Sequence, residues 1–296
     1  MPTSMFRGEV LDVIIIGAGP AGLSAAVNTK VRNLRVIVID PHDPVAKVRT
    51  YLEVTNYLGF PKVSGAKLAE RFYQHFAKTG FPYKKERATK IVPMEGGFLT
   101  ATSQNVYRSS AVILTVGVVQ TKMLPGEEQY LGRGVSYCVT CDGALFRGKD
   151  VVVVGYISEG EEEANALAGL ARSVTYVATY DNVQTLEKTV KLVHTTPKSV
   201  EGDSRMHGLM TELGEIKADG IFIAREAVPM GTLLEGLVIT DNYIDVDGQM
   251  ATSIPGVFAA GDCIGPPFQI AKSVGQGQVA GLSAARHVYK ERKKGS

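Results

Sequence analysis

Two segments of the chain share one pattern, in which a short apolar run ends at a glycine and a helix-like stretch follows. The first is "DVIIIGAGPAGLSAAV", Asp12 to Val27, and the second is "DVVVVGYISEGEEEANALAGL", Asp150 to Leu170. Each precedes a second apolar run, "LRVIVID" ending at Asp40 and "SVTYVATYD" ending at Asp181. Apolar β-branched runs that alternate with helical stretches predict parallel sheets covered by helices. We therefore expect an α/β fold with two similar units.

At 296 residues the chain is long enough for about two domains, and its composition, with 45% hydrophobic residues, is that of an ordinary globular protein. The 32 basic and 30 acidic residues give a net charge of +2, so no large basic surface argues for nucleic acid. Only Lys290 to Lys294 is locally basic, and we interpret this run as solvated surface. The first apolar run, Val13 to Ile16, is too short for a signal peptide or a membrane span. We expect a cytoplasmic protein without membrane contact.

The first unit carries a glycine pattern that is typical of dinucleotide binding. Gly17, Gly19 and Gly22 follow the apolar run in the spacing G-x-G-x-x-G. This spacing provides a tight turn, close approach of the backbone to a diphosphate, and a helix N-terminus that faces the anion. Asp40 ends the next apolar run, where a carboxylate can accept hydrogen bonds from ribose hydroxyls. We predict a bound dinucleotide, and the alternative is a glycine turn kept for packing.

The chain has three cysteines, Cys138, Cys141 and Cys263, which is not the pattern of a secreted disulfide framework. A structural zinc site normally needs four ligands, and the five histidines are scattered, so we expect no metal site. Two residues separate Cys138 from Cys141, which allows a disulfide to open and close without large backbone movement. We predict a redox-active pair with Asp142 beside it, and the alternative is two buried cysteines. We interpret Cys263 as a packing residue.

Four stretches of the chain carry more specific motifs. They are "GAGPAGLSAA" near the start, "TNYLGFP" at Thr55 to Pro61, "LPGEEQYLGRGVSYCVTCDG" at Leu124 to Gly143, and "GVFAAGDC" near the end. With these motifs nearly the whole chain resembles the low-molecular-weight thioredoxin reductase family. The resemblance implies an α/β fold of two Rossmann-like dinucleotide-binding domains with three layers, the first of them discontinuous. Residues 1–117 and 240–296 would bind FAD, and residues 118–239 would carry the redox disulfide on a degenerate NADPH-binding-like fold.

The resemblance also implies the functional residues. Those along FAD would be Gly17, Gly19, Gly22, Asp40, Asn56, Gly261, Asp262 and Gln269. In the redox pair, Cys141 would face the flavin, Cys138 would attack the disulfide of a partner, and Asp142 would give or take the proton. The partner would be thioredoxin or a thioredoxin-like protein, and the chain would form a homodimer.

The second unit departs from the family at its glycine turn. The NADPH users of the family have glycine at the first two fingerprint positions, whereas this chain has Gly155, Ile157 and Gly160. Ile157 fills the space through which a diphosphate approaches the backbone. Four glutamates are expected where the anion would lie: Glu159, Glu161, Glu162 and Glu163. The stretch 175–187 contains no basic residue that could hold a 2′-phosphate.

These departures resemble the ferredoxin-dependent flavin thioredoxin reductases. We therefore predict an FAD enzyme that reduces thioredoxin with electrons from ferredoxin rather than NADPH. Two alternatives stay open. Because Asp181 is placed to bind the ribose of NADH, the chain could be a nicotinamide-dependent thioredoxin reductase with an unusual nucleotide site. It could also be a flavin redox sensor or binding module whose disulfide switches a partner interaction without turnover.

Overall fold

The chain divides into two compact units in a computed structural model that describes residues 10–117, 123–225 and 230–294. The first unit comprises residues 1–100, 106–119 and 229–296, and the second comprises residues 101–105 and 120–228. Each unit has its own sheet and its own buried core, so we describe them separately. The assignment of FAD binding to residues 1–117 and 240–296, and of the redox disulfide to residues 118–239, stays a prediction.

The first unit is built on a seven-stranded sheet in the order β3-β2-β1-β6-β5-β4, with β17 paired to β6. The strands are β1 (Leu11–Ile16), β2 (Val36–Ile39), β3 (Tyr83–Lys84), β4 (Ala88–Met94), β5 (Gly97–Thr102), β6 (Val106–Leu114) and β17 (Val257–Ala259). Parallel pairs join β1 to β2 and β6, β2 to β3, and β6 to β17. A two-stranded antiparallel ribbon consists of β15 (Ile239–Thr240) and β16 (Tyr243–Ile244). The predicted parallel sheet is confirmed.

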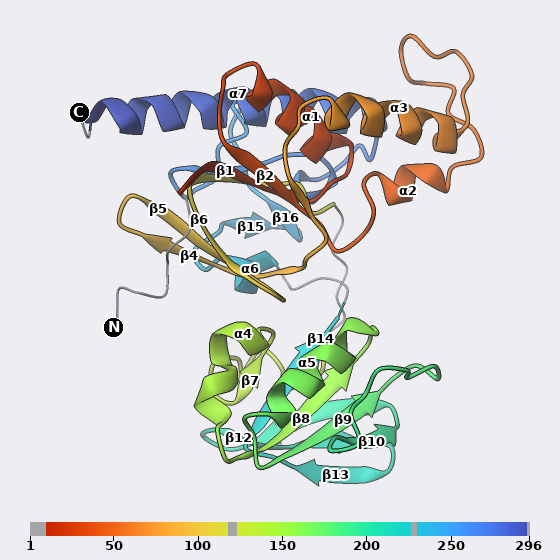
Figure 1. Ribbon diagram of the computed structural model, residues 1–296, viewed down its shortest axis with the longest axis vertical. Helices are drawn as coiled ribbons and strands as arrows, with labels where there is room; N and C mark the ends of the chain where they lie inside the picture. Colours follow the sequence, from red (N-terminus) through yellow and green to blue (C-terminus); the bar gives the residue numbers. More distant parts are fainter. Residues whose placement is uncertain (1–9, 118–122, 226–229, 295–296) are drawn as a thin grey trace. The chain divides into compact units, whose positions relative to one another are not determined.

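Three helices lie on one face of this sheet, namely α1 (Pro20–Lys30), α3 (Gly65–Ala77) and α7 (Ile270–Lys294) (Figure 1). The alternation along β1 explains the two cores, because Val13 and Ile15 pack on these helices. Ile14 and Ile16 point to the opposite core, which includes Leu234. The shorter helices are α2 (Ala46–Arg49), α6 (Met230–Leu233) and the 3₁₀ helix η2 (Asp262–Ile264).

Helices α1 and α7 lie side by side because small residues face one another (Figure 1). A Cβ atom at Gly277 would lie 2.0 Å from the carbonyl oxygen of Ala21. The hydroxyl of Ser24 donates to the carbonyl oxygen of Val274 at 2.7 Å. The last helix of the chain is thus fixed against the helix that follows the first glycine turn.

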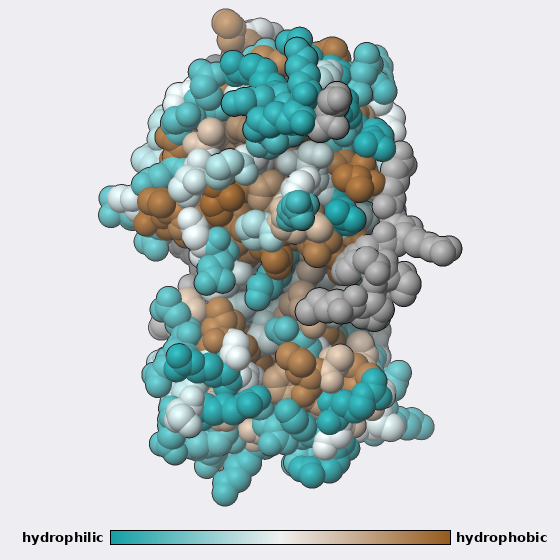
Figure 2. Space-filling model, turned by 90° about the vertical axis from the view of Figure 1, so that its left-hand side faces the viewer, coloured by the Kyte–Doolittle hydropathy of each residue, from teal (hydrophilic) through white to brown (hydrophobic). Residues whose placement is uncertain are grey.

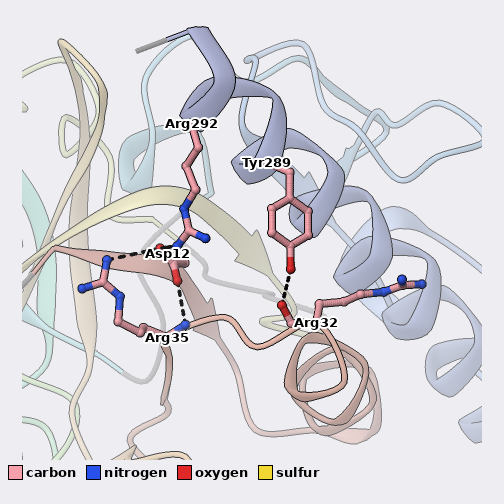
Figure 3. Close-up of polar contacts among 5 residues, drawn as sticks. All are labelled: Asp12, Arg32, Arg35, Tyr289 and Arg292. Atoms are coloured by element: carbon pink, nitrogen blue, oxygen red, sulfur yellow. Dashed lines mark hydrogen bonds and ion pairs between the residues drawn. The ribbon is translucent and has the colours of Figure 1, made fainter. Parts of the chain in front are cut away.

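The buried carboxylate of Asp12 connects the start of β1 to the far end of α7 (Figure 3). It accepts hydrogen bonds from the Arg292 guanidinium at 2.6 Å and from the Arg35 backbone N–H at 2.7 Å. Burial raises the pKa of Asp12, but the hydrogen bonds from Arg35 and Arg292 outweigh it, so the pKa lies below its ordinary value. Tyr289 donates its hydroxyl proton to the carbonyl oxygen of Arg32 in the same cluster.

The end of α7 is exposed and charged. Lys290 to Lys294 is exposed throughout, and this end of the helix forms the hydrophilic cluster at the top of Figure 2. The ion pair between Lys294 and Glu291, 2.7 Å long, is formed within the run itself. The interpretation as solvated surface holds for the lysines of this run but is incomplete for Arg292, which pairs with the buried Asp12. None of the helices in the described ranges has both the length and the apolar character that crossing a membrane requires.

The second unit has a five-stranded parallel sheet in the order β10-β9-β8-β14-β7. Its strands are β7 (Val135–Ser136), β8 (Asp150–Gly155), β9 (Ser173–Ala178), β10 (Lys191–His194) and β14 (Gly220–Ala224). The second apolar run therefore ends at Ala178, and the expected end at Asp181 is wrong. An antiparallel sheet of β11 (Pro197–Gly202), β12 (Met206–Thr211) and β13 (Gly214–Lys217) was not predicted.

These elements form three layers. Helix α5 (Glu159–Ala168) covers β8 and β9 on one side, and β12 contacts β14 on the other. Along β8, Val151 and Val153 pack in the core on the α5 side, whereas Val152 and Val154 pack in the core beneath the antiparallel sheet. The remaining elements are the short helix α4 (Val139–Asp142) and the 3₁₀ helix η1 (Gly143–Phe146). Both units have the dinucleotide-binding topology that the repeated pattern predicts.

Candidate functional site

The three glycines of the first turn have different surroundings. A Cβ atom at Gly17 would lie 2.2 Å from the carbonyl oxygen of Thr115, and one at Gly22 would lie 1.9 Å from that of Gly17. Gly17 also has a φ of +106°, which favours glycine. At Gly19, in contrast, a Cβ atom would meet nothing within 4 Å. The outer glycines are thus required by packing, and the middle glycine opens onto free space.

That free space lies at the N-terminus of α1. Gly19 is the N-cap residue without a side-chain cap, and Pro20 occupies the first turn. The first turn of α1 contains no acidic residue. Backbone N–H groups at such a helix start are available to an anion, and the helix dipole favours negative charge there.

A second turn approaches the same helix start from the far end of the sequence. Gly261 follows β17 with a φ of +88°, and a Cβ atom there would lie 3.0 Å from the Cβ of Ala21. Helix α7 holds this turn, because Gln276 accepts a hydrogen bond from the Gly261 N–H at 3.1 Å. The hydroxyl of Ser273 donates to the Asp262 carboxylate at 3.2 Å. The structure thus brings Gly261 and Asp262 to the first glycine turn.

Asp40 faces the same turn. One of its carboxylate oxygens accepts from the Ala18 N–H at 2.6 Å and the other accepts from the His42 N–H at 2.8 Å. Burial raises the pKa of this carboxyl group above its ordinary value. A carboxylate has about four lone-pair sites, so each oxygen can still accept a second hydrogen bond, for example from a ribose hydroxyl.

Two further predicted residues contact each other directly. The side-chain amide of Asn56 donates to Gln269 Oε1 at 2.7 Å, although 213 positions separate the two residues. Both side chains are exposed. All eight residues that the resemblance places along FAD lie in the first unit, and an open anion-binding helix start with converging polar groups fits that cofactor.

The predicted cysteine pair forms a disulfide in the second unit. Cys138 and Cys141 are bonded across the start of α4, with 5.3 Å between their Cα atoms. The Cys141 N–H donates to the Cys138 sulfur at 3.1 Å. Cys138 is buried and Cys141 is exposed in this conformation. The separate roles proposed for the two sulfurs stay predictions.

Asp142 lies beside the disulfide in a short hydrogen-bond chain. The hydroxyl of Ser136 donates to Asp142 Oδ2 at 2.7 Å and accepts from the Cys138 N–H at 3.0 Å. The structure therefore brings together all three residues that we predict to be catalytic. Ser136 was not predicted as part of the site.

Cys263 is separate from this chemistry. It is 1% exposed, and its sulfur contacts the carbonyl oxygens of Ala260 and Leu114 at 3.3 and 3.5 Å. Burial raises the pKa of this thiol to about 12, so it is protonated at neutral pH. The interpretation of Cys263 as a packing residue is confirmed. Within the described ranges, no group of three or more His, Cys, Asp or Glu side chains is arranged to hold a metal ion.

In the second unit, the buried side chain of Tyr176 packs against the glycine turn. A Cβ atom at Gly155 would lie 1.9 Å from the Tyr176 hydroxyl oxygen, and one at Gly160 would lie 2.9 Å from it. The hydroxyl oxygen of Tyr176 also lies 3.3 Å from the carbonyl oxygen of Ile157. Both glycines are thus required for packing on a tyrosine.

One of the four glutamates has a different position from that expected. Glu161 is 1% exposed, so its expected place at a diphosphate site is wrong. Its carboxylate accepts from the Tyr180 hydroxyl at 2.8 Å, from the Gln184 N–H at 3.0 Å and from the Thr185 hydroxyl at 2.8 Å. Glu161 therefore holds the segment that follows β9. Glu159 and Glu162 are exposed in the first turn of α5, and Asp181 is exposed beyond the end of β9.

Comparisons with known proteins agree with this geometry. The family model for pyridine nucleotide-disulphide oxidoreductases matches residues 11–284. The chain belongs to this family. A thioredoxin reductase of Bacillus subtilis is 33% identical, and the match covers 96% of each protein. A ferredoxin-flavin thioredoxin reductase from Clostridium acetobutylicum matches in structure with a TM-score of 0.86 and 41% identity, covering 95% of this chain and 98% of that one.

A further solved structure, the atypical thioredoxin reductase TRi from Desulfovibrio vulgaris Hildenborough, has a TM-score of 0.73 and 30% identity. That match covers 95% of this chain and 99% of the other. As a pyridine nucleotide-disulphide oxidoreductase, the chain is a flavin-dependent disulfide oxidoreductase of the thioredoxin reductase type, and FAD is its cofactor.

Sequence reasoning missed one further residue of this disulphide oxidoreductase. Lys272 donates from its ammonium group to the carbonyl oxygens of Gly261 and Gly265, and burial lowers its pKa. It therefore holds the turn that carries Asp262. The polar residues Lys272, Ser273 and Gln276 at the start of a helix that is otherwise rich in small residues were the available signal.

Proposed function

We propose that this protein reduces thioredoxin or a thioredoxin-like protein through the Cys138–Cys141 pair, with reduced ferredoxin rather than NADPH as the electron donor. The observation that carries the choice of donor is the contrast between the two turns. The first turn leaves open space at Gly19, whereas the second has Ile157 at the equivalent position and Tyr176 packed behind both glycines. The likeness to a ferredoxin-flavin thioredoxin reductase supports the same choice.

In this proposal the first unit holds FAD. Gly17, Gly19 and Gly22 would form the turn that holds its diphosphate, and the N–H groups at the start of α1 would donate to it. The remaining contacts come from Asp40, Asn56, Gly261, Asp262 and Gln269. Bound FAD supplies the ability to accept electrons singly and to pass a pair to a disulfide.

The second unit then carries out the exchange with the partner. Reduction opens the Cys138–Cys141 bond, and one thiolate attacks the disulfide of the partner. By resemblance that thiolate belongs to Cys138, and Cys141 subsequently displaces the reduced partner. Asp142 is the group that moves the proton required by the leaving thiolate, because its carboxyl group is held beside the redox loop by the Ser136 hydroxyl, which also accepts from the Cys138 backbone N–H.

The experiment is anaerobic. The oxidised protein is mixed with NADPH, NADH or chemically reduced ferredoxin, and flavin bleaching and then thioredoxin reduction are followed. We expect rapid bleaching and turnover with ferredoxin alone. Saturable turnover with NADPH or NADH would overturn the choice of donor. Bleaching by ferredoxin without catalytic reduction of thioredoxin would instead favour a redox sensor.

A further inference from the structure

Ser136 joins the two ends of the redox loop through a single hydroxyl group. It is 4% exposed and is the last residue of β7. Its oxygen accepts the hydrogen bond from the Cys138 N–H and its proton is donated to Asp142, at 3.0 and 2.7 Å. A hydroxyl has one proton to donate, so this contact commits Ser136 to the carboxylate.

Buried contacts fix the backbone at Ser136 and at the residue that follows it. Ser136 itself is paired with Phe222 of β14. The hydroxyl of the next residue, Tyr137, donates to Glu127, and the other oxygen of Glu127 accepts from Arg225 at 2.7 Å. Tyr137, Glu127 and Arg225 are each at most 6% exposed. Because these buried contacts hold Ser136 and Tyr137, the Ser136 hydroxyl is a fixed point relative to which Asp142 is oriented.

We propose that Ser136 is a positioning residue, which holds the Asp142 carboxyl group in place for proton transfer during dithiol-disulfide exchange. This inference rests on the proposed proton role of Asp142. In the exchange, an enzyme thiolate forms a bond to one sulfur of the substrate disulfide, the substrate S–S bond breaks, and a thiolate leaves. The second enzyme cysteine then displaces the second substrate thiolate. The two protons of the enzyme dithiol end on the two product thiols, and Asp142 transfers them.

The physical consequence depends on the leaving thiolate. A poorly acidic aliphatic thiol leaves slowly unless it receives a proton, whereas a strongly acidic aromatic thiol leaves readily as the anion. An acid group held in the right place therefore accelerates the first kind of substrate and does little for the second. A residue with a purely structural role would affect both kinds alike.

The experiment uses the dithiol form of the full-length protein and two small disulfides, bis(2-hydroxyethyl) disulfide and 5,5′-dithiobis(2-nitrobenzoate). We expect Ser136→Ala to slow reduction of the aliphatic disulfide about tenfold, and that of the aromatic disulfide by less than about twofold. The protein is reduced chemically beforehand, so the result does not depend on ferredoxin or on the flavin. A failure of the proposed electron donor and a failure of this inference are therefore distinguishable.

Two further variants complete the test. Ser136→Thr keeps the hydroxyl and should restore most of the rate with the aliphatic disulfide. In an Asp142→Asn background, Ser136→Ala should cause no further selective loss, since the two residues act as one unit. Equal slowing of both disulfides by Ser136→Ala, or the same selective loss with and without Asp142, would overturn the inference. Thermal unfolding of each variant records any loss of stability separately.

Discussion

The two glycine turns of this protein differ in the space beside their glycines. At Gly19 there is room for a ligand, because nothing lies within 4 Å of the position that a Cβ atom would take. In the second turn Ile157 occupies the equivalent position, and the Tyr176 hydroxyl lies against Gly155 and Gly160. The same strand-turn-helix pattern thus leaves open space at the turn of one unit and is filled by a tyrosine in the other.

Replacement of Gly19 should separate binding from folding. Gly19→Val places a side chain in the open space, and the backbone at Gly19, with φ of −74°, tolerates any residue. We expect FAD affinity to fall at least about tenfold, while the melting temperature of the flavin-free protein changes little. Flavin titration of the apoprotein and thermal unfolding measure the two effects.

Gly22→Ala is the matched control. Its Cβ would lie 1.9 Å from the Gly17 carbonyl oxygen, so it should also lower the melting temperature of the flavin-free protein. Unchanged flavin affinity in Gly19→Val would contradict the assignment of this turn to FAD.

Cys263 should be chemically inert in the folded protein. Burial raises the pKa of its thiol to about 12, so the reactive thiolate is scarce and inaccessible at neutral pH. After mild reduction, an alkylating reagent at about pH 8 should therefore modify Cys138 and Cys141 but not Cys263. Mass spectrometry of peptides tests this, and denaturant should add the third modification. Rapid labelling of Cys263 without denaturant would refute the prediction.

At the scale of elements, buried carboxylates hold segments that the sheets alone do not fix. Glu161 on α5 holds the segment after β9 through Gln184 and Thr185. Asp12 on β1 holds the far end of α7 through Arg292. Each carboxylate joins elements that are distant in the sequence. Its removal should therefore weaken the attachment of one segment and leave the packing of the hydrophobic core unchanged.

Glu161→Gln should destabilise the second unit. A glutamine side chain has one oxygen acceptor in place of two, so some of the donors around Glu161 lose their partner, at a cost of about 2 kcal/mol. The exposed neighbour provides a control, because Glu162→Gln changes the same charge without touching the buried contacts. Urea unfolding compares the two variants. Equal stability of Glu161→Gln and Glu162→Gln would contradict the role of Glu161.

Asp12 should make stability dependent on acid pH. Its pKa in the folded protein lies below the ordinary value, so its stabilising contribution is present above the unfolded pKa and is lost as pH falls through the folded pKa. Between about pH 6 and pH 3 the wild-type protein should therefore lose more unfolding free energy than Asp12→Asn. Denaturant titrations at both pH values measure this difference, and an identical loss in both proteins would exclude a contribution from Asp12.

At the scale of the whole molecule, charge gives little long-range guidance to a partner. The net charge is +2, with 32 basic and 30 acidic residues. Ferredoxins are generally acidic and would be attracted by a strongly basic partner. Because the net charge of this protein is small, its electrostatic attraction for ferredoxin beyond the Debye length should be weak. The proposed electron transfer therefore depends on short-range docking.

The ionic-strength dependence of turnover tests this view. Between about 0.05 M and 0.5 M salt, we expect the rate with limiting reduced ferredoxin to fall by less than about tenfold. Reduction of the flavin by an uncharged chemical donor under the same conditions is the control. A much steeper fall with ferredoxin would indicate a local basic docking surface in spite of the small net charge.

The sequence by itself determined the elements with strong local signals. The continuous apolar runs predicted β1, β2 and β8, because a strand in a parallel sheet that is covered on both faces buries every residue along it. The glycine spacing predicted the first turn, since a positive φ at Gly17 is a local property. The close spacing of Cys138 and Cys141 predicted their disulfide for the same reason.

Only the tertiary structure decided which charged and polar groups are inside. A row of glutamates looks alike in the sequence, yet Glu161 is buried by Tyr180 and Thr185 while Glu162 is exposed. Ser136 became part of the site only when β7 and α4 placed its hydroxyl between Asp142 and Cys138. The physical reason is that hydrogen bonds act over about 3 Å between groups whose proximity is set by packing, and the order of residues along the chain does not encode that distance.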